Sequence, residues 1–208
     1  MKQLSTPTPT TTPFFKAIVI GVSAGGMEAL MSIIPKLPED FNCPIIIVQH
    51  RSASEDDFLV EYFNRNSKIE VLEAKSNNRI EPNKIYFAPG GYHLMVEEDF
   101  SFSLSLDIPV NYAIPSIDLF FESAALAYKN RLIGVVLTGA NSDGAKGLKI
   151  ITDFKGIAIV EDPQTANTPT MPQSALNETP ANYVLKKEEI ADKLMELCGS
   201  TEQIRERG

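Results

Sequence analysis

The chain has 208 residues, 43% of them hydrophobic and 22% charged, and its 27 acidic and 19 basic side chains give a net charge of −8. That length suits one domain with a sizeable core, and the acidic balance argues against binding to nucleic acid or to an anionic membrane surface. No apolar run approaches the ~20 residues that a membrane-spanning helix requires, and the N-terminus lacks the apolar core of a secretion signal.

Two cysteines, Cys43 and Cys198, lie far apart in the sequence and in no metal or redox spacing. We therefore expect reduced thiols in a cytoplasmic protein, with no metal and no cofactor. Residues 1–15 are rich in Thr and Pro and predict a flexible lead-in, whereas residues 199–208 predict a frayed charged tail.

Between these ends, at residues 16–198, predicted strands alternate with predicted helices. Apolar runs predict strands at 17–20, 44–49, 69–72, 84–88, 131–139 and 156–160, and helices are predicted at about 24–35, 55–65, 116–130, 144–155 and 187–197. Residues 92–106 alternate polar and apolar side chains around an acidic turn at 97–99, which is typical of an antiparallel hairpin. The order predicts a single α/β domain with a doubly wound, mostly parallel, Rossmann-like three-layer sheet plus that hairpin.

The first strand ends in a turn that fits the G-x-S-x-G pattern through Gly21, Ser23 and Gly25. In this elbow a strained strand-to-helix turn exposes a serine hydroxyl above the sheet edge. The helix that follows directs free N–H groups and its positive dipole end toward the same place. The pattern indicates half of a hydrolase site, because a serine hydroxyl needs an adjacent base.

The chain has two histidines, His50 and His93. His50 directly follows the second buried strand, so it ends at the same sheet edge as Ser23. His93 opens the predicted hairpin, and its position relative to that edge is open. A histidine near a strand end is often a structural residue, but the pairing with an elbow serine favours His50 as the general base.

A carboxylate is needed to orient the imidazole, and Asp143 is the one acid in the polar turn after the third buried strand. Asp143 could equally serve as a cap of the following helix, with Asp118 or Asp162 as the orienting group instead. The N–H of Ala24, the residue after the nucleophile, would form one half of an oxyanion hole. Backbone in the 139–141 turn would form the other half.

Several motifs over residues 16–198 resemble the catalytic domain of the CheB family of protein-glutamate methylesterases. They are Ile-Gly-Val-Ser-Ala-Gly-Gly, Val-Gln-His, Ala-Pro-Gly-Gly-Tyr-His, Pro-Ser-Ile-Asp, Leu-Thr-Gly-Ala-Asn-Ser-Asp-Gly-Ala and Met-Pro-Gln-Ser-Ala. The resemblance implies a triad of Ser23, His50 and Asp143 in that chain order. It also implies an oxyanion donor at the N–H of Ala140, where the family usually has methionine. Met171 and Pro172 match a family loop beside the site, which implies substrate contact, although a packing role is equally open.

The resemblance implies hydrolysis of γ-glutamyl methyl esters on chemoreceptors with release of methanol, and glutamine deamidation as a related activity. The family's founding members carry an N-terminal receiver domain, and this chain has the Thr/Pro-rich lead-in instead. Regulation is therefore expected to be absent or to come from a separate response regulator. Two alternatives stay open, a non-catalytic signalling module and an esterase or amidase of small molecules.

Overall fold

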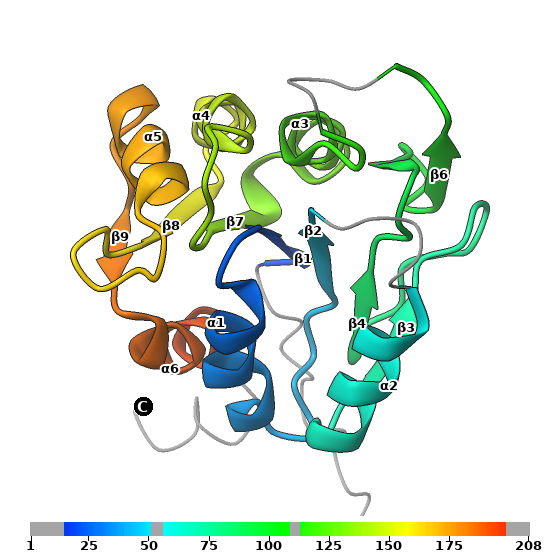
Figure 1. Cartoon of the computed structure of the whole chain (residues 1–208). Helices are drawn as coiled ribbons and strands as arrows, with labels where there is room; N and C mark the ends of the chain where they lie inside the picture. Colours follow the sequence, from blue (N-terminus) through cyan, green and yellow to red (C-terminus); the bar gives the residue numbers. More distant parts are fainter. Residues whose placement is uncertain (1–14, 51–55, 109–112, 199–208) are drawn as a thin grey trace, which may run out of the picture.

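The computed structural model describes residues 15–50, 56–108 and 113–198. Seven parallel strands form one sheet in the order β3-β4-β2-β1-β7-β8-β9, and β5 and β6 form a separate antiparallel pair (Figure 1). The strands are β1 (Ala17–Val22), β2 (Ile45–Gln49), β3 (Glu70–Glu73), β4 (Lys84–Phe87), β5 (His93–Val96), β6 (Phe102–Ser105), β7 (Leu132–Val136), β8 (Ile157–Glu161) and β9 (Tyr183–Leu185).

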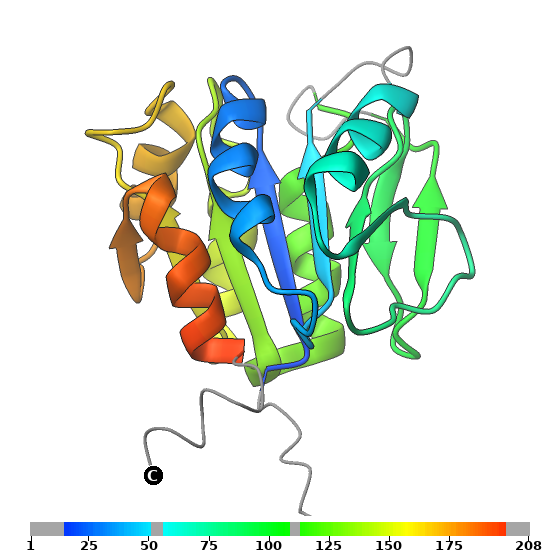
Figure 2. The same cartoon turned by 90° about the horizontal axis from the view of Figure 1, so that it is seen from below.

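Helices cover both faces of the sheet and make three layers (Figures 1 and 2). The helices are α1 (Gly26–Ile33), α2 (Asp56–Asn66), α3 (Ile117–Tyr128), α4 (Ala145–Asp153), α5 (Thr170–Glu178) and α6 (Lys187–Cys198). Residues of α1, α2 and α6 share one core cluster, and residues of α3, α4, α5 and the β5-β6 hairpin share the other. The expected three-layer α/β fold with an antiparallel hairpin is confirmed.

Strand β1 lies at the centre of the sheet, and all six of its residues are buried. Because side chains alternate along a strand, Ile18 and Ile20 enter one core cluster while Ala17 and Val19 enter the other. Burial on both faces explains the continuous apolar run in the sequence. The parallel register then brings the carboxyl ends of β1, β2 and β7 to one edge of the sheet.

Gly21 is the position in β1 where a side chain would not fit, because a Cβ there would lie 2.4 Å from Cγ2 of Ile117. The glycine therefore allows the first residue of α3 to pack directly on the end of β1. As a result the N-terminus of α3 lies at the same sheet edge as the serine elbow.

Helix α1 is shorter than expected, because it begins at Gly26 and gives way to a 3-10 turn at Ile34–Lys36, where Pro35 removes a backbone donor. Two elements were not predicted from the sequence, helix α5 and strand β9. Both are short, and β9 has no fully buried residue. Phe15, the last residue of the expected lead-in, packs against the core.

The remainder of the expected lead-in and the whole of the expected tail at 199–208 lie outside the described residues. So do the side chains of residues 54–57, which the sequence predicts to cap α2. Both cysteines are free thiols buried in one core cluster. Among the described helices, none combines the length and the apolar character needed to cross a membrane.

Candidate active site

Ser23 follows β1 directly, and its backbone N–H donates to the carbonyl of Thr138 at 3.0 Å. Gly25, two residues later, has φ +81°, a left-handed conformation that favours glycine. A Cβ at Gly25 would also lie 2.8 Å from Cβ of Asn167. The turn therefore depends on glycine at Gly25, as the elbow pattern predicts.

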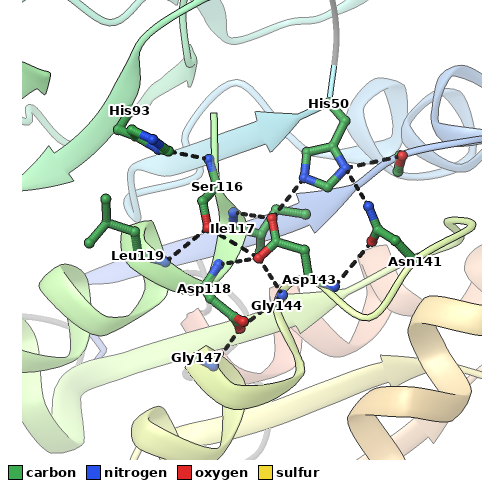
Figure 3. A network of polar contacts seen from close by, with 11 residues as sticks. His50, His93, Ser116, Ile117, Asp118, Leu119, Asn141, Asp143, Gly144 and Gly147 are labelled. Carbon is green, nitrogen blue, oxygen red and sulfur yellow. Dashed lines mark hydrogen bonds and ion pairs between the residues drawn. The ribbon is translucent and has the colours of Figure 1, made fainter. Parts of the chain in front are cut away.

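His50 follows β2, and its N–H donates to the carbonyl of Val22 at 3.2 Å, which holds it beside the elbow. Its Nδ1 lies 3.3 Å from Ser23 Oγ. Its Nε2 lies 2.8 Å from Oδ2 of Asp143 (Figure 3). The side chain of His50 is 14% exposed and that of Asp143 is 1% exposed. Hydroxyl, imidazole and carboxylate thus form one row, with the ring nitrogens in the reverse of the order found in chymotrypsin.

Asp143 also caps helix α3. Its Oδ2 accepts from the N–H of Ile117 at 2.7 Å, and its Oδ1 accepts from the N–H of Asp118 at 2.9 Å and from Ser116 Oγ at 3.2 Å. The sequence left two roles open for this residue, orienting the histidine and capping a helix. The structure joins Asp143 to both groups, because it contacts His50 and caps α3. Its Oδ1 also accepts from the N–H of Gly144 at 3.1 Å, at the start of the helix that follows it in the chain.

Asp118 does the same for helix α4, because its Oδ1 accepts from the N–H groups of Gly144 and Gly147 at 2.9 and 2.8 Å. Asp143, which precedes α4, therefore caps α3, and Asp118, which lies in α3, caps α4 (Figure 3). Burial raises the pKa of Asp118, and the nearby Asp143 charge adds to that rise. Burial would also raise the pKa of Asp143, but hydrogen bonds from His50, Asp118 N–H and Ile117 N–H outweigh it and lower that pKa.

The other acid and histidine weighed in the sequence do not contact the serine or His50. Asp162 accepts from the N–H of Gln164 at 2.9 Å in a surface turn. His93 is fully buried, and its Nδ1 accepts from the N–H of Ser116 at 3.2 Å while Nε2 lies 3.2 Å from the carbonyl of Ile108. Both groups are structural in this arrangement.

Ala24 and Ala140, the predicted oxyanion donors, are both exposed at this edge. Within the described part of the chain, no hydrogen-bond acceptor is bonded to either backbone N–H. The N-terminus of α1 has no side-chain cap, so no carboxylate or hydroxyl of the cap residue neutralises its positive end. These groups are free to stabilise a transient negative charge.

Thr138 joins the two halves of the site, a role that the sequence did not reveal. Its Oγ1 donates to the carbonyl of Ala24 at 2.9 Å and accepts from the N–H of Thr168 at 2.8 Å. Its own N–H donates to Oε2 of Glu161 at 2.8 Å. Glu161 is fully buried at the end of β8, and burial raises the pKa of its carboxyl. The feature of the sequence that could have indicated this contact is an acidic residue, Glu161, at the end of a buried strand.

Met171 and Pro172 lie in the first turn of α5, and not in a loop as the resemblance suggested. The N–H of Met171 donates to the carbonyl of Gly139 at 2.9 Å, so this turn supports the backbone that leads to Ala140. Met171 is 1% exposed. Contact of either residue with substrate stays a prediction.

A hydroxyl, an imidazole and a carboxylate in series at the carboxyl edge of an α/β sheet define the class of serine hydrolases. Comparison with known proteins identifies the family within that class. The CheB methylesterase family profile matches residues 18–194. The chain therefore belongs to the CheB methylesterase family.

A crystal structure of the Thermotoga maritima CheB methylesterase catalytic domain is similar, with a TM-score of 0.85 and 36% identity over 88% of this chain and 98% of that one. A Leptospira interrogans relative, provisionally named protein-glutamate methylesterase/protein-glutamine glutaminase, is 46% identical over 88% of this chain and 95% of its own length. The Clostridium acetobutylicum protein of that name is 34% identical, again over 88% of this chain. The match covers 53% of that relative, so this chain spans about half of its length.

Proposed function

We propose that this protein hydrolyses γ-glutamyl methyl esters on methyl-accepting chemoreceptors and releases methanol. The observation that carries the proposal is the unbroken row from Ser23 Oγ through His50 to Asp143, in a chain of the CheB methylesterase family. The named activities of the relatives support the choice of substrate.

In the first half of the reaction, Ser23 Oγ attacks the ester carbonyl while Nδ1 of His50 takes the hydroxyl proton. Negative charge develops on the carbonyl oxygen, and the N–H groups of Ala24 and Ala140 stabilise it. Asp143 stabilises the imidazolium that forms, because its carboxylate is held ionised by the hydrogen bonds at the N-terminus of α3. His50 then returns the proton to the leaving methoxide, and methanol departs.

In the second half, His50 takes a proton from water as the water oxygen attacks the acyl-enzyme. The ester bond to Ser23 breaks as His50 returns that proton to Ser23 Oγ, and the receptor side chain leaves as glutamate. Glutamine deamidation follows the same steps with ammonia as the leaving group. Met171 and Pro172 are proposed to border the bound substrate through the turn at Gly139.

The partners follow from this chemistry. The substrate is a methylated receptor domain in the cytoplasm, and a separate response-regulator protein is proposed to control access to the site. No part of the reaction calls for nucleic acid or insertion into a membrane.

The test measures methanol release from a methylated receptor fragment by wild-type protein, Ser23→Ala and Ser32→Ala. Ser32 is the matched control, because its hydroxyl bonds within α1 to the carbonyl of Glu28. We expect Ser23→Ala to lose about 10⁶-fold in rate, as removal of a catalytic serine does, and Ser32→Ala to retain full activity. Full activity in Ser23→Ala would refute the proposal, and turnover of small esters without any action on the receptor would reassign the substrate.

A further inference from the structure

The side-chain amide of Asn141, in the turn between β7 and α4, lies against the proposed catalytic base (Figure 3). Its Oδ1 accepts from the N–H of Asp143 at 3.1 Å, and its Nδ2 lies 3.1 Å from Nδ1 of His50. The first bond is local, two residues along the chain, and is the type of turn that asparagine favours. Because that bond occupies the amide oxygen, the amide NH₂ is the group that faces the imidazole.

The hydrogen-bond chemistry of His50 fixes what Asn141 can do. An ionised carboxylate only accepts hydrogen bonds, so the contact with Asp143 at 2.8 Å requires a proton on Nε2. In the neutral ring, Nδ1 then offers a lone pair and no hydrogen. Asn141 N–H and Ser23 O–H therefore donate to the same lone pair, at 3.1 and 3.3 Å.

Protonation of His50 changes the Asn141 contact from a hydrogen bond to a repulsion between two donors. Once Nδ1 carries a proton, its N–H faces the N–H of Asn141, and two donors cannot bond to each other. The contact therefore favours the neutral ring over the imidazolium. Among the described residues, Asp143 is the charged group in contact with His50, and it favours the imidazolium. Asp118 lies one step further away, where it caps α4, and Ser23 is uncharged.

We propose that Asn141 is a positioning residue that holds His50 in the Nε2–H tautomer and keeps it unprotonated between turnovers. Asp143 and Asn141 then act on the two ring nitrogens in opposite directions. The first prepares the ring to become charged during the reaction, and the second opposes charging from solvent. The catalytic part of this inference rests on the proposed function.

The first experiment records kcat/KM against pH for wild-type protein, Asn141→Ala, Asn141→Asp and Asn64→Asp. Loss of the donor in Asn141→Ala should move the acid limb upward by about half a pH unit to one unit, the equivalent of one net hydrogen bond. Asn141→Asp keeps the acceptor for Asp143 N–H but places a carboxylate against Nδ1, so the shift should exceed about one unit.

Asn64→Asp is the matched control, because it makes the same change at an exposed position of α2 and preserves the oxygen that accepts from Val71 N–H. This control should leave the acid limb in place. An acid limb that stays unmoved in both Asn141 variants would overturn the proposal. A rate that falls equally at every pH would also overturn it, because that is the result of a merely structural role.

The second experiment needs no substrate, so it separates this inference from failure of the proposed function. The chain has two histidines, and ¹⁵N imidazole spectra of the folded protein therefore contain two ring systems, of which His93 serves as the internal reference. We expect an unprotonated Nδ1 on His50 near neutral pH, and protonation of the ring at higher pH in both Asn141 variants. A proton on Nδ1 in the neutral wild-type ring would overturn the proposal even if the protein proved inactive on receptors.

Discussion

Helices α1 and α3 both begin at the carboxyl edge of the sheet, yet their N-termini are treated in opposite ways. In α3 the first three N–H groups are occupied, two by the Asp143 carboxylate and the third by Ser116 Oγ at 3.4 Å. In α1 the N-cap is Gly25, which provides no side-chain acceptor, and the first N–H, that of Gly26, donates to the backbone carbonyl of Ser23 at 2.9 Å. Since a helix N-terminus stabilises negative charge, α3 holds a permanent carboxylate. Helix α1 has no such carboxylate, and the N–H of Ala24, two residues before it, is proposed to stabilise a charge that exists only during the reaction.

In the proposed mechanism, one sheet edge therefore holds two anions, the permanent Asp143 carboxylate and the oxyanion that forms during the reaction. The fixed anion is deeply buried and bonded from several directions, which keeps it ionised and immobile. The transient one needs donors that are accessible and unpaired, and Ala24 and Ala140 meet that description. The predictions below disturb each site in turn.

Asp143→Asn should have the largest effect. An amide has one oxygen in place of two, so its NH₂ group must face donors in either orientation. In place of Oδ2 it faces the N–H of Ile117 and Nε2–H of His50, and in place of Oδ1 it faces the N–H of Asp118. By analogy with the equivalent change in chymotrypsin-type enzymes, the rate should fall about 10⁴-fold. Stability should fall by about 2 kcal/mol, because charge-assisted bonds at the start of α3 are lost. Receptor demethylation measures the change in rate, and urea unfolding measures the change in stability. Unchanged activity would show that the Asp143 carboxylate has no part in the reaction.

Gly25→Ala disturbs the proposed oxyanion site with an intermediate effect. The new Cβ meets Asn167 and the backbone must keep φ near +81°, at a cost of about 1–3 kcal/mol for a left-handed non-glycine residue. Movement of the turn displaces the N–H of Ala24, and loss of one oxyanion donor typically lowers kcat about 10²-fold. Measurement of kcat alongside thermal unfolding would separate the two effects. Lowered stability together with a wild-type kcat would show that the N–H of Ala24 is not an oxyanion donor.

Asp118→Asn should have the smallest effect, seen in how stability depends on pH. The pKa of Asp143 is lowered by folding, so its contribution is present above the unfolded value, near pH 4, and is lost as pH falls through the folded pKa. The pKa of Asp118 is raised, so the unfolded chain ionises first and stability declines as pH rises above about 4. Asparagine keeps an Oδ1 for Gly144 and Gly147 but removes that decline.

The free energy of unfolding, measured by urea titration between pH 4 and 7, should therefore decline less with rising pH in Asp118→Asn than in wild-type protein. Parallel curves for the two proteins would mean that the buried Asp118 carboxylate carries no net penalty.

The central strands and the three principal side chains could be predicted from the sequence because their signals are local. Strands buried on both faces appear as apolar runs, and the residue after each strand must lie at a common edge in a parallel sheet. That reasoning located Ser23, His50 and Asp143 together. It failed for β9, which has three residues and none fully buried, and for α5, which buries three of its nine residues.

Contacts between the turns could not be predicted, because they depend on how α3 and α4 approach each other. The exchange of caps between Asp118 and Asp143 joins residues 25 positions apart, and the contact between Asn141 and His50 joins residues 91 positions apart. No periodicity marks such pairs. For Asp143, helix capping and orientation of the histidine also looked like alternatives in the sequence, while the structure joins one carboxylate to both groups.

Reactivity of the Ser23 hydroxyl toward a fluorophosphonate tests the account most directly, because that reagent modifies a serine only when a neighbouring base activates it. Intact-protein mass and peptide mapping would locate the adduct in wild-type protein and in His50→Gln. The account predicts a single adduct on Ser23 of the folded wild type and none in the variant. A folded wild-type protein that stays unmodified, or an adduct on another serine, would contradict it.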